Sequence, residues 1–352
     1  MKKRLLAVVL VVAMTMTTLL ACSSKDDTKE TASTKETETK SEDTEELPEV
    51  TKVILNEVAH SIFYAPMYVA IEEGYFEEEG IDLELVTGFG ADKTMTAVLS
   101  GSADIGFMGS EASIYTYNEG ANDYVVNFAQ LTQRAGNFLV AREEMPDFTW
   151  DDLKGKDVLG GRKGGMPEMV FEYILRQNGI DPSTDVNIDQ SIDFGSTAAA
   201  FAENQADFTV EFEPGATNLE KEGKGYVVAS LGTDSGYVPY TAFSAKKSYI
   251  DKNPEVIQGF TNALQKGMDY VQTHTPEEIA AIIAPQFKET DTETITTIVT
   301  RYYDQDTWKE NLVFEEESFD LLQDILEDAG ELTERAPYED LVTTEFADKA
   351  AR

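Results

Sequence analysis

The sequence of 352 residues carries 66 acidic and 28 basic side chains, which gives a formal net charge of −38 at pH 7. This acidity argues against a nucleic-acid partner and against electrostatic docking onto anionic lipid. Any anion-binding site would need its own local positive potential, because the field of the whole chain repels an anionic ligand.

The N-terminus has the pattern of a secretory signal peptide that ends in a lipidation site. Basic residues at 2–4 precede an apolar run over residues 5–14, and the segment Leu-Leu-Ala stands directly before Cys22. The apolar run is too short for a permanent transmembrane helix, and a small residue before Cys22 suits signal-peptidase cleavage with thioether lipidation of the cysteine. We therefore expect a lipid anchor on the extracytoplasmic side of the cell membrane. An ordinary signal peptide with an incidental cysteine is the alternative.

Cys22 is the only cysteine in the chain. An internal disulfide and a metal site built on thiolates are therefore excluded, and we expect neither a metal nor a cofactor. Residues 22–50 are rich in Ser, Thr, Lys, Asp and Glu and contain few apolar side chains. Such a segment cannot bury enough apolar surface to fold, so we expect a disordered acidic tether.

The stretch of residues 53–85 predicts a strand, a loop, a helix and a second strand. It opens on β-formers, continues with Tyr68, Ile71 and Tyr75 on one helical face, and closes on the alternation of a half-buried strand. Two parallel strands joined by a helix form a right-handed crossover. The loop at residues 57–63 then lies at the carboxyl end of a strand, where ligands bind in open α/β sheets.

The segment Tyr64–Leu85, YAPMYVAIEEGYFEEEGIDLEL, resembles the opening signature of a family of ABC-importer solute-binding proteins for nitrate, sulfonates, taurine and the pyrimidine precursor of thiamine. The resemblance to these SsuA-like and NMT1-like proteins extends from about Val53 to about Phe287. It implies an α/β, two-lobed periplasmic-binding-protein type II fold with a ligand cleft between the lobes. It also implies a monomer without enzymatic activity, which binds a small molecule and delivers it to an ABC permease and its ATPase subunit.

A weak internal repeat supports two similar α/β lobes. Residues 97–105 and 200–208 both read as a helix, a tight turn and an apolar strand that opens with Ala-Asp. We expect the chain to cross between lobes at the apolar segments 138–141 and 240–243, and the C-terminal helices to wrap lobe I with Trp308 in its core. The predicted division is a signal peptide at 1–21, a tether at 22–50, lobe I at 53–142 plus 243–352, and lobe II at 143–242.

Loops at strand ends should line the cleft on the side of lobe I. Two glycines around Phe89 let the backbone approach a ligand closely, and Ser110 suits the N-cap of the following helix. Gln130 and Thr132 are polar residues at the end of an apolar strand. The candidate ligand-binding residues of lobe I are Phe63, Tyr64, Gly88, Phe89, Gly90, Gly109, Ser110, Glu111, Gln130 and Thr132.

In lobe II a glycine-rich turn at residues 160–167 leads into a helix. Backbone N–H groups and the helix dipole would form an anion cradle there, reinforced by Arg162 and Lys163. Glu211 follows an apolar strand and could accept N–H donors from a ligand, and Tyr237 could stack on a ring. The candidate ligand-binding residues of lobe II are Arg162, Lys163, Gly164, Gly165, Met166, Ser196, Glu211 and Tyr237.

The residues before Tyr68 bear on the kind of ligand. In the pyrimidine-binding branch of the resembling family we expect a histidine four residues before this position, whereas the chain has Tyr64 there and His60 further upstream. The Tyr-Ala-Pro sequence looks more like the nitrate and sulfonate branch. The many aromatic residues in the candidate loops suit an organic ligand, either a sulfonate or taurine-like molecule or a heteroaromatic one such as a thiamine pyrimidine precursor.

Two other classes of protein remain as alternatives. An enzyme, such as one resembling a pyrimidine synthase, would need convergent catalytic groups, but the chain has only His60 and His274 and lacks GxSxG and HExxH motifs. A surface lipoprotein with an adhesive or structural role would suit the tether and the lipid equally well. The regular strand-end loops with glycine and aromatic residues favour a ligand cleft.

Overall fold

The computed structural model describes residues 50–192, 195–203 and 206–352. The expected signal peptide, the lipidation site at Cys22 and the tether up to residue 49 lie outside these residues. Within the described ranges, no helix is both long enough and apolar enough to cross a membrane.

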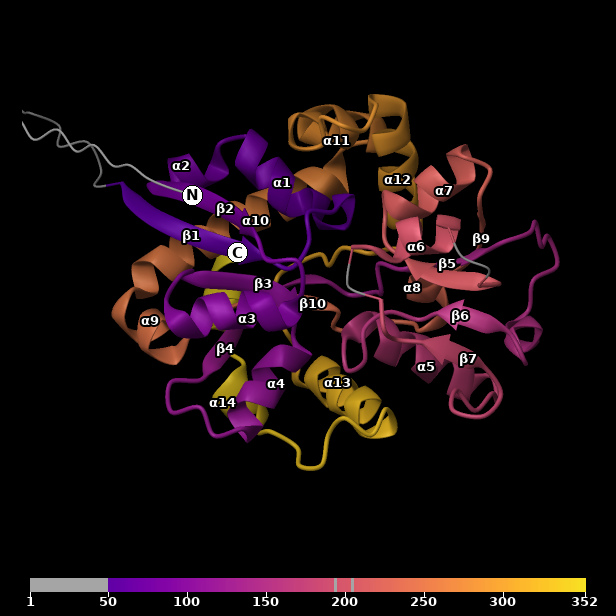
Figure 1. Ribbon diagram of the computed structural model, residues 1–352. Coiled ribbons are helices and arrows are strands. Elements are labelled where there is room, and N and C mark those ends of the chain that lie inside the picture. Colours follow the sequence, from indigo (N-terminus) through magenta and orange to yellow (C-terminus); the bar gives the residue numbers. More distant parts are fainter. Residues whose placement is uncertain (1–49, 193–194, 204–205) are drawn as a thin grey trace, which may run out of the picture. The chain divides into compact units, whose positions relative to one another are not determined.

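The first of two five-stranded sheets has the strand order β2-β1-β3-β10-β4 (Figure 1). β1 pairs in parallel with β2 and β3, whereas β10 comes from much later in the chain and pairs antiparallel with β3 and β4. β3 and β4 are buried along their whole length, as is typical of strands covered on both faces. The strands are β1 (Thr51–Glu57), β2 (Ile81–Thr87), β3 (Ile105–Gly109), β4 (Val125–Thr132) and β10 (Thr241–Lys246).

The second sheet has the strand order β7-β6-β8-β5-β9. β6 pairs in parallel with β7 and β8, and β5 lies antiparallel between β8 and β9. The two sheets thus share one plan, a parallel part joined by an antiparallel strand. The strands are β5 (Phe138–Ala141), β6 (Asp157–Leu159), β7 (Asn187–Asp189), β8 (Phe208–Glu211) and β9 (Tyr226–Ser230).

The passage from the first sheet to the second differs from the expected one. We assigned residues 138–141 to lobe I, but they form β5 of the second sheet, where Phe138 lies opposite Glu211 and Ser230. The chain therefore leaves the first sheet between residues 132 and 138. Apolar residues show that a segment is a buried strand but do not identify its pairing partners, which here lie about 70 to 90 residues further along the chain.

The helical unit predicted near the start of the fold is present. Ser61 accepts a hydrogen bond from the Phe63 N–H and opens η1 (Ile62–Tyr64), and α1 (Ala65–Glu72) follows directly. Gly74 has a φ of +75°, which a side chain would strain, and it separates α1 from α2 (Tyr75–Glu78).

The remaining helices lie between the strands in the sequence or come after the last strand. They are α3 (Ala91–Ser100), α4 (Glu111–Asn118), η2 (Trp150–Leu153), α5 (Met166–Gln177), α6 (Thr197–Glu203), α7 (Gly215–Lys221), α8 (Leu231–Asp234), α9 (Lys247–Lys252), α10 (Pro254–Thr273), α11 (Pro276–Ile283), η3 (Ala284–Gln286), α12 (Thr292–Asp304), α13 (Glu316–Asp328), α14 (Tyr338–Leu341) and α15 (Glu345–Ala350).

The two Ala-Asp segments of the sequence repeat play equivalent parts in the two sheets. The carboxylate of Asp104 accepts a hydrogen bond from the Ile54 N–H of β1 at 2.9 Å. The carboxylate of Asp207 accepts one from the Asp157 N–H of β6 at 3.1 Å. In each sheet the aspartate before one strand therefore accepts a hydrogen bond from a backbone N–H of the parallel neighbouring strand. Residues 204–205 of the second copy lie outside the described residues.

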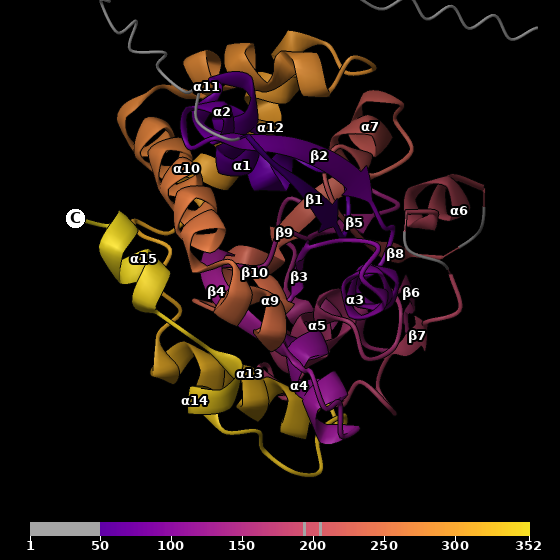
Figure 2. The same ribbon diagram turned by 90° about the vertical axis from the view of Figure 1, so that its left-hand side faces the viewer.

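We had expected the C-terminal helices to cover the first sheet alone. They also contact elements around the second sheet. α10 packs against α1 and α15 beside the first sheet (Figure 2). Arg301 of α12, however, contacts Glu213 after β8 at 2.7 Å, and Asp328 of α13 lies 3.2 Å from Arg176 of α5. These ion pairs join C-terminal helices to elements around the second sheet.

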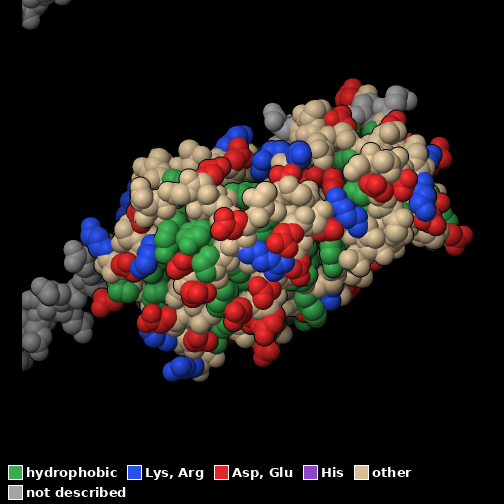
Figure 3. Space-filling model, turned by 90° about the horizontal axis from the view of Figure 1, so that it is seen from below, with side chains coloured by type: hydrophobic (Ala, Val, Ile, Leu, Met, Phe, Trp, Pro, Cys, Tyr) green, Lys and Arg blue, Asp and Glu red, His purple; other side chains and the backbone are tan. Residues whose placement is uncertain are grey.

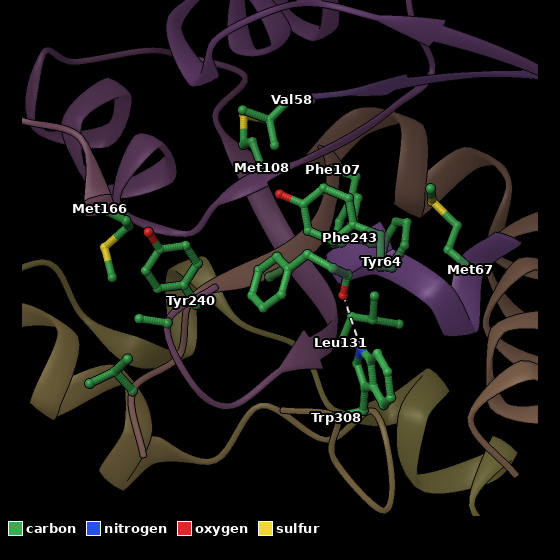
Figure 4. Packing of buried hydrophobic residues seen from close by; sticks show 14 of the residues in the cluster. Val58, Tyr64, Met67, Phe107, Met108, Leu131, Met166, Tyr240, Phe243 and Trp308 are labelled. Carbon is green, nitrogen blue, oxygen red and sulfur yellow. Dashed lines mark hydrogen bonds between the residues drawn. The ribbon is translucent and has the colours of Figure 1, made fainter. Parts of the chain in front are cut away.

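Trp308 belongs to the buried core, as predicted. Its indole Nε1 donates to the backbone oxygen of Phe63 at 2.8 Å (Figure 4), and only 7% of the residue is exposed. This contact fixes the segment after α12 against the loop that follows β1.

Candidate functional site

A cavity of about 310 Å³ lies among loops that follow strands of both sheets. On the side of the first sheet it is lined by the segments after β1, β2 and β3. On the side of the second sheet it is lined by the glycine-rich turn before α5 and the segment after β8. This volume is at the small end of the ~300–1,000 Å³ that small-molecule sites usually occupy.

Many of the candidate residues meet at this cavity. They come from five of the segments that the sequence singled out. Figure 4 shows Tyr64, Met166 and Tyr240 among the buried hydrophobic residues. The candidates that line it are Tyr64, Phe89, Gly90, Gly109, Glu111, Arg162, Gly165, Met166 and Glu211.

The other candidates do not line the cavity. Phe63 is fully buried and packs its ring against Phe212 and Tyr240, which do line it. Thr132 lies in β4 at the end of the strand order, where its hydroxyl bonds Thr241 Oγ1 at 2.6 Å. The candidates outside the lining are Phe63, Gly88, Ser110, Gln130, Thr132, Lys163, Gly164, Ser196 and Tyr237.

Tyr237 is an exposed surface residue. Its ring is covered by the guanidinium of Arg134 at 4.2 Å, and its hydroxyl donates to Asp306. With 56% of the residue exposed and both groups already engaged, Tyr237 is not part of the cavity lining.

The glycine-rich turn before α5 faces carboxyl groups of the chain itself. The Gly164 N–H donates to Glu168 at 3.0 Å, and the Met166 N–H points at the carboxyl of Glu111. Lys163 lies 3.4 Å from Glu331, away from the cavity. The expected anion cradle is therefore largely occupied by protein carboxyls.

Glu111 begins α4 and has a buried carboxyl group. A Cβ on Gly109 would lie 2.1 Å from Oε2 of Glu111, so glycine leaves the room that this carboxyl needs. Oε2 has no hydrogen-bond partner among the described residues. Burial raises the pKa of Glu111 to about 7, although its own backbone N–H, the charge of Arg162 and the Met166 N–H oppose the rise.

Glu211 ends β8 and carries a second buried carboxyl group. It accepts hydrogen bonds from the hydroxyls of Thr209 at 2.7 Å and Thr197 at 3.0 Å. Burial raises its pKa to about 7, against the effect of the two hydroxyls and with a small addition from the charge of Glu213.

His60 also lines the cavity. It belongs to the loop at residues 57–63, which the sequence placed at a strand end, although it was not among the candidate ligand-binding residues. Its Nδ1 lies 2.8 Å from Glu57 Oε1, and its Nε2 lies 3.0 Å from the backbone oxygen of Gln286. The fully buried Glu57 also accepts hydrogen bonds from the hydroxyls of Tyr68 and Thr87. The place of His60 in the loop that follows β1 was the signal for this residue.

The loop after β1 is tied to the segment after β8. The Ser61 hydroxyl donates to the backbone oxygen of Glu213 at 2.9 Å. The side chain of Glu213 is fully buried and is held by Arg301 and by the backbone N–H of Thr217. Ser61 and Glu213, which were not among the candidate residues, thus join the two sides of the cavity.

No group of three or more His, Cys, Asp and Glu side chains among the described residues is placed to hold a metal ion. The polar side chains at the cavity are carboxyls, hydroxyls, the carboxamide of Asn137, one guanidinium and one imidazole. This set suits recognition of an organic molecule through hydrogen bonds and ring contacts.

Two α/β sheets whose strand-end loops surround one cavity define the fold of a periplasmic binding protein. The alkanesulfonate-binding protein SsuA from Xanthomonas axonopodis pv. citri, solved with bound MOPS, matches with a TM-score of 0.69 at 15% identity over 85% of this chain and 100% of that chain. The nitrate-binding protein NrtA from Synechocystis PCC 6803 matches with a TM-score of 0.68 at 18% identity over 86% and 89% of the two chains. At these identities the likeness shows the fold alone.

The chain belongs to the NMT1/THI5-like family, whose sequence model matches residues 62–279. It is 48% identical over 300 residues to "Putative binding protein YtlA" of Bacillus subtilis (strain 168), covering 85% of this chain and 90% of the relative. It is 24% identical over 214 residues to "Riboflavin-binding protein RibY" of Chloroflexus aurantiacus, covering 59% and 58% of the two chains. The family resemblance inferred from the sequence is confirmed, and the class is that of solute-binding proteins.

Proposed function

We propose that this protein is a lipid-anchored, extracytoplasmic solute-binding protein that captures a small organic ligand and delivers it to an ABC permease and its ATPase subunit. The observation that carries the proposal is a cavity with walls from the loops of both sheets. The names of the relatives and structural neighbours, which are mainly binding proteins, support it. Cys22, the predicted site of lipidation, would hold the monomeric protein at the membrane.

The proposed mechanism is hinge closure of two lobes, one around each sheet. A ligand that contacts both walls favours the closed arrangement by its differential affinity for that arrangement. The hydrogen bond from Ser61 to the Glu213 backbone joins the two walls directly, and the contact of Arg162 with Asp92 at 4.0 Å adds a second junction. These junctions would form on closure and part on release.

Aromatic side chains favour an organic ligand over a small inorganic anion. Tyr64, Phe89, Phe212 and Tyr240 all line the cavity, and their faces suit a flat ring or an apolar body. The buried carboxyls disfavour a sulfonate or taurine-like anion, so among the ligands expected from the sequence the heteroaromatic class fits better. The printed name of RibY, a riboflavin-binding relative, agrees with this choice.

A thermal-shift screen of the purified protein against heterocycles, sulfonates and taurine tests the proposed function. Saturation at about 100 times the dissociation constant adds roughly 2.7 kcal/mol of stability, which raises Tm by several degrees. Phe89→Ala should weaken binding of a hit several-fold, because Phe89 lines the cavity. The matched control is Tyr237→Ala, another exposed aromatic residue, which lies outside the lining and should leave binding unchanged. A panel that raises Tm nowhere would contradict a solute-binding function.

The anchor is tested separately. Replacing Cys22 with Ser should move the protein from the membrane fraction to the soluble fraction of the expressing cells, because no thioether can form. If the variant stays in the membrane fraction to the same extent, the lipid-anchor proposal is wrong.

A further inference from the structure

Three basic side chains, His60, Arg162 and Arg301, lie at the cavity or contact one of its acidic residues. Each of them is paired with an acidic side chain. Glu111 and Glu211 line the cavity but form no ion pair with any described residue. The cavity therefore carries an excess of acidic groups. The three existing pairs are His60 with Glu57 at 2.8 Å, Arg162 with Asp92 at 4.0 Å, and Arg301 with Glu213 at 2.7 Å.

The surroundings of Glu111 contain phenol groups and one guanidinium, that of Arg162, which forms no ion pair with it. Burial is the main cause of the raised pKa values of Tyr64, Tyr115 and Tyr240, and the nearby carboxyl of Glu111 adds to the rise in each case. The charge of Arg162 acts on Glu111 from a position beside Asp92, with 43% of the arginine side chain exposed. The carboxyl thus has no close positive partner of its own.

The surroundings of Glu211 are equally poor in positive charge. Its two hydrogen bonds come from the neutral hydroxyls of Thr197 and Thr209, and the charged residue that acts on it is another acid, Glu213. Arg301, the cation nearest to Glu213, is already shared between Glu213 and Glu220. The described residues therefore supply no ion-pair partner for Glu211.

We propose that the ligand of this cavity is an organic cation with a flat apolar body, whose positive charge is balanced by Glu111 and Glu211. This inference rests on the proposed solute-binding function and narrows its ligand to one charge class. The ligand must be small, since it fills a cavity of about 310 Å³.

Several physical effects favour a cationic ligand over a neutral or anionic one. A buried carboxyl without a partner is costly to ionise, and a bound cation removes that cost, whereas a bound anion adds to it. Tyr64, Phe89 and Tyr240 line the cavity, and aromatic rings attract a cation that lies over their faces. The formal charge of −38 attracts cations over a longer range, and acidic side chains are spread over the face seen in Figure 3.

The test compares flat probes of similar shape and different charge. Benzamidinium is the cationic probe, benzamide the neutral probe and benzenesulfonate the anionic probe. Each probe is tested together with further small flat metabolites of the same charge. Calorimetry and thermal shift on the purified protein should show binding at least about tenfold tighter for the cations than for the neutral molecules, and none for the anions.

Substitutions then test whether Glu111 and Glu211 are the groups that balance the charge of the ligand. Glu111→Gln and Glu211→Gln keep the side-chain shape and should each reduce the preference for cations over neutral probes by about tenfold. Glu119→Gln is the matched control, because Glu119 is an exposed glutamate at the other end of α4 and should leave the preference unchanged. The two tested positions lie in different elements, α4 and β8, so misfolding of one variant leaves the other as a test.

The possible outcomes separate this inference from the proposed function. Binding confined to neutral or anionic molecules would overturn the charge class while the solute-binding function stands. A cation preference that survives both substitutions would overturn the role of these carboxyls. If no member of any charge class raises Tm, both proposals fail.

Proton release gives a second readout. At pH 7, carboxyls with pKa values of about 7 each hold about half a proton. A bound cation lowers both pKa values and should release up to about one proton in total. Calorimetry in buffers with different ionisation enthalpies measures this number. Binding of a cation without any proton release would contradict contact with these two groups.

Discussion

The imidazole of His60 is held between the carboxylate of Glu57 and the backbone oxygen of Gln286. Nε2 carries a hydrogen, because a backbone carbonyl only accepts hydrogen bonds. Nδ1 likewise faces a carboxylate oxygen at 2.8 Å that accepts and does not donate. The structure therefore favours the doubly protonated ring, and the hydrogen bond to Glu57 raises the pKa of His60 above its ordinary value of 6.5 against the effect of burial.

This arrangement predicts a titration of His60 above pH 6.5. Because the pKa is raised in the folded state, the interaction with Glu57 stabilises the protein fully below about pH 6.5, and this stabilisation is lost as the pH rises through the folded-state pKa. NMR of the imidazole signal in a His274→Gln background measures it, since only one histidine then remains. Glu57→Gln should return the titration toward the ordinary value. A His60 titration at or below pH 6.5 would contradict the prediction.

Glu111 predicts the opposite dependence on pH. A carboxyl whose pKa rises from 4.5 to about 7 on folding makes the protein less stable as the pH increases over that interval. Glu111→Gln should therefore raise the free energy of unfolding at pH 8 by about 3 kcal/mol, with a much smaller gain at pH 5. Urea denaturation at both values measures this. Glu119→Gln should have little effect at either pH, and equal effects of the two substitutions would speak against a strained carboxyl at residue 111.

Arg301 predicts a large loss of stability on truncation. Its guanidinium bonds Glu213, whose side chain is fully buried, and Glu220, whose side chain is partly exposed. Arg301→Ala leaves a buried charge without a partner and should cost about 3 kcal/mol or more in the free energy of unfolding. Adding Glu213→Gln should restore part of that loss.

The control for Arg301 is Arg335→Ala. Arg335 also bonds two carboxylates, Asp324 and Glu327, but it does so at the surface, so its loss should cost less than about 1 kcal/mol. Unfolding of both variants in guanidinium chloride measures the two losses of stability. If the two variants lose similar amounts of unfolding free energy, burial of Glu213 does not determine the contribution of Arg301 to stability.

Gly267 predicts a reversal of ordinary helix propensity. Alanine is usually better than glycine inside a helix by about 1 kcal/mol. In α10, however, a Cβ at residue 267 would lie 2.2 Å from the backbone oxygen of Pro66 in α1. Gly267→Ala should therefore lower the free energy of unfolding by about 2 kcal/mol or more, as overpacking does.

Gly259 of the same helix provides the comparison. There the nearest atom to an added Cβ is Cβ of Glu79 at 3.3 Å, so Gly259→Ala should cost less than about 1 kcal/mol. Thermal or chemical denaturation of both variants measures the difference. Equal effects would mean that the contact between α1 and α10 adjusts easily.

Local patterns predicted the first βαβ unit because its signals lie within one short stretch. The apolar spacing of Tyr68 and Ile71, the break at Gly74 and the alternation from Ile81 onward each depend on neighbouring residues. The place of β5 could not be predicted in this way. Its partners, β8 and β9, are distant in the chain, and an apolar run such as 138–141 fits the interior of either sheet.

The same distinction applies to the candidate site. The rule that ligands meet strand ends located Glu111 and Glu211, because both directly follow or end a buried strand. It failed for Thr132, since strand order, which the sequence does not reveal, puts β4 at the far end of its sheet. It failed for Lys163 because neighbouring side chains in a tight turn point in different directions, and Lys163 turns to Glu331.

The carboxyl of Glu111 is enclosed by α4, which follows a strand of the first sheet, and by the Met166 N–H at the start of α5, which belongs with the second. A movement that separates these two helices would admit water to the carboxyl and lower its pKa. The two shapes of the protein would then differ in the protons that they hold, so an acidic medium would favour the enclosed shape and an alkaline one the hydrated shape. Hydrogen ions would thus take part in opening and closing alongside the solute.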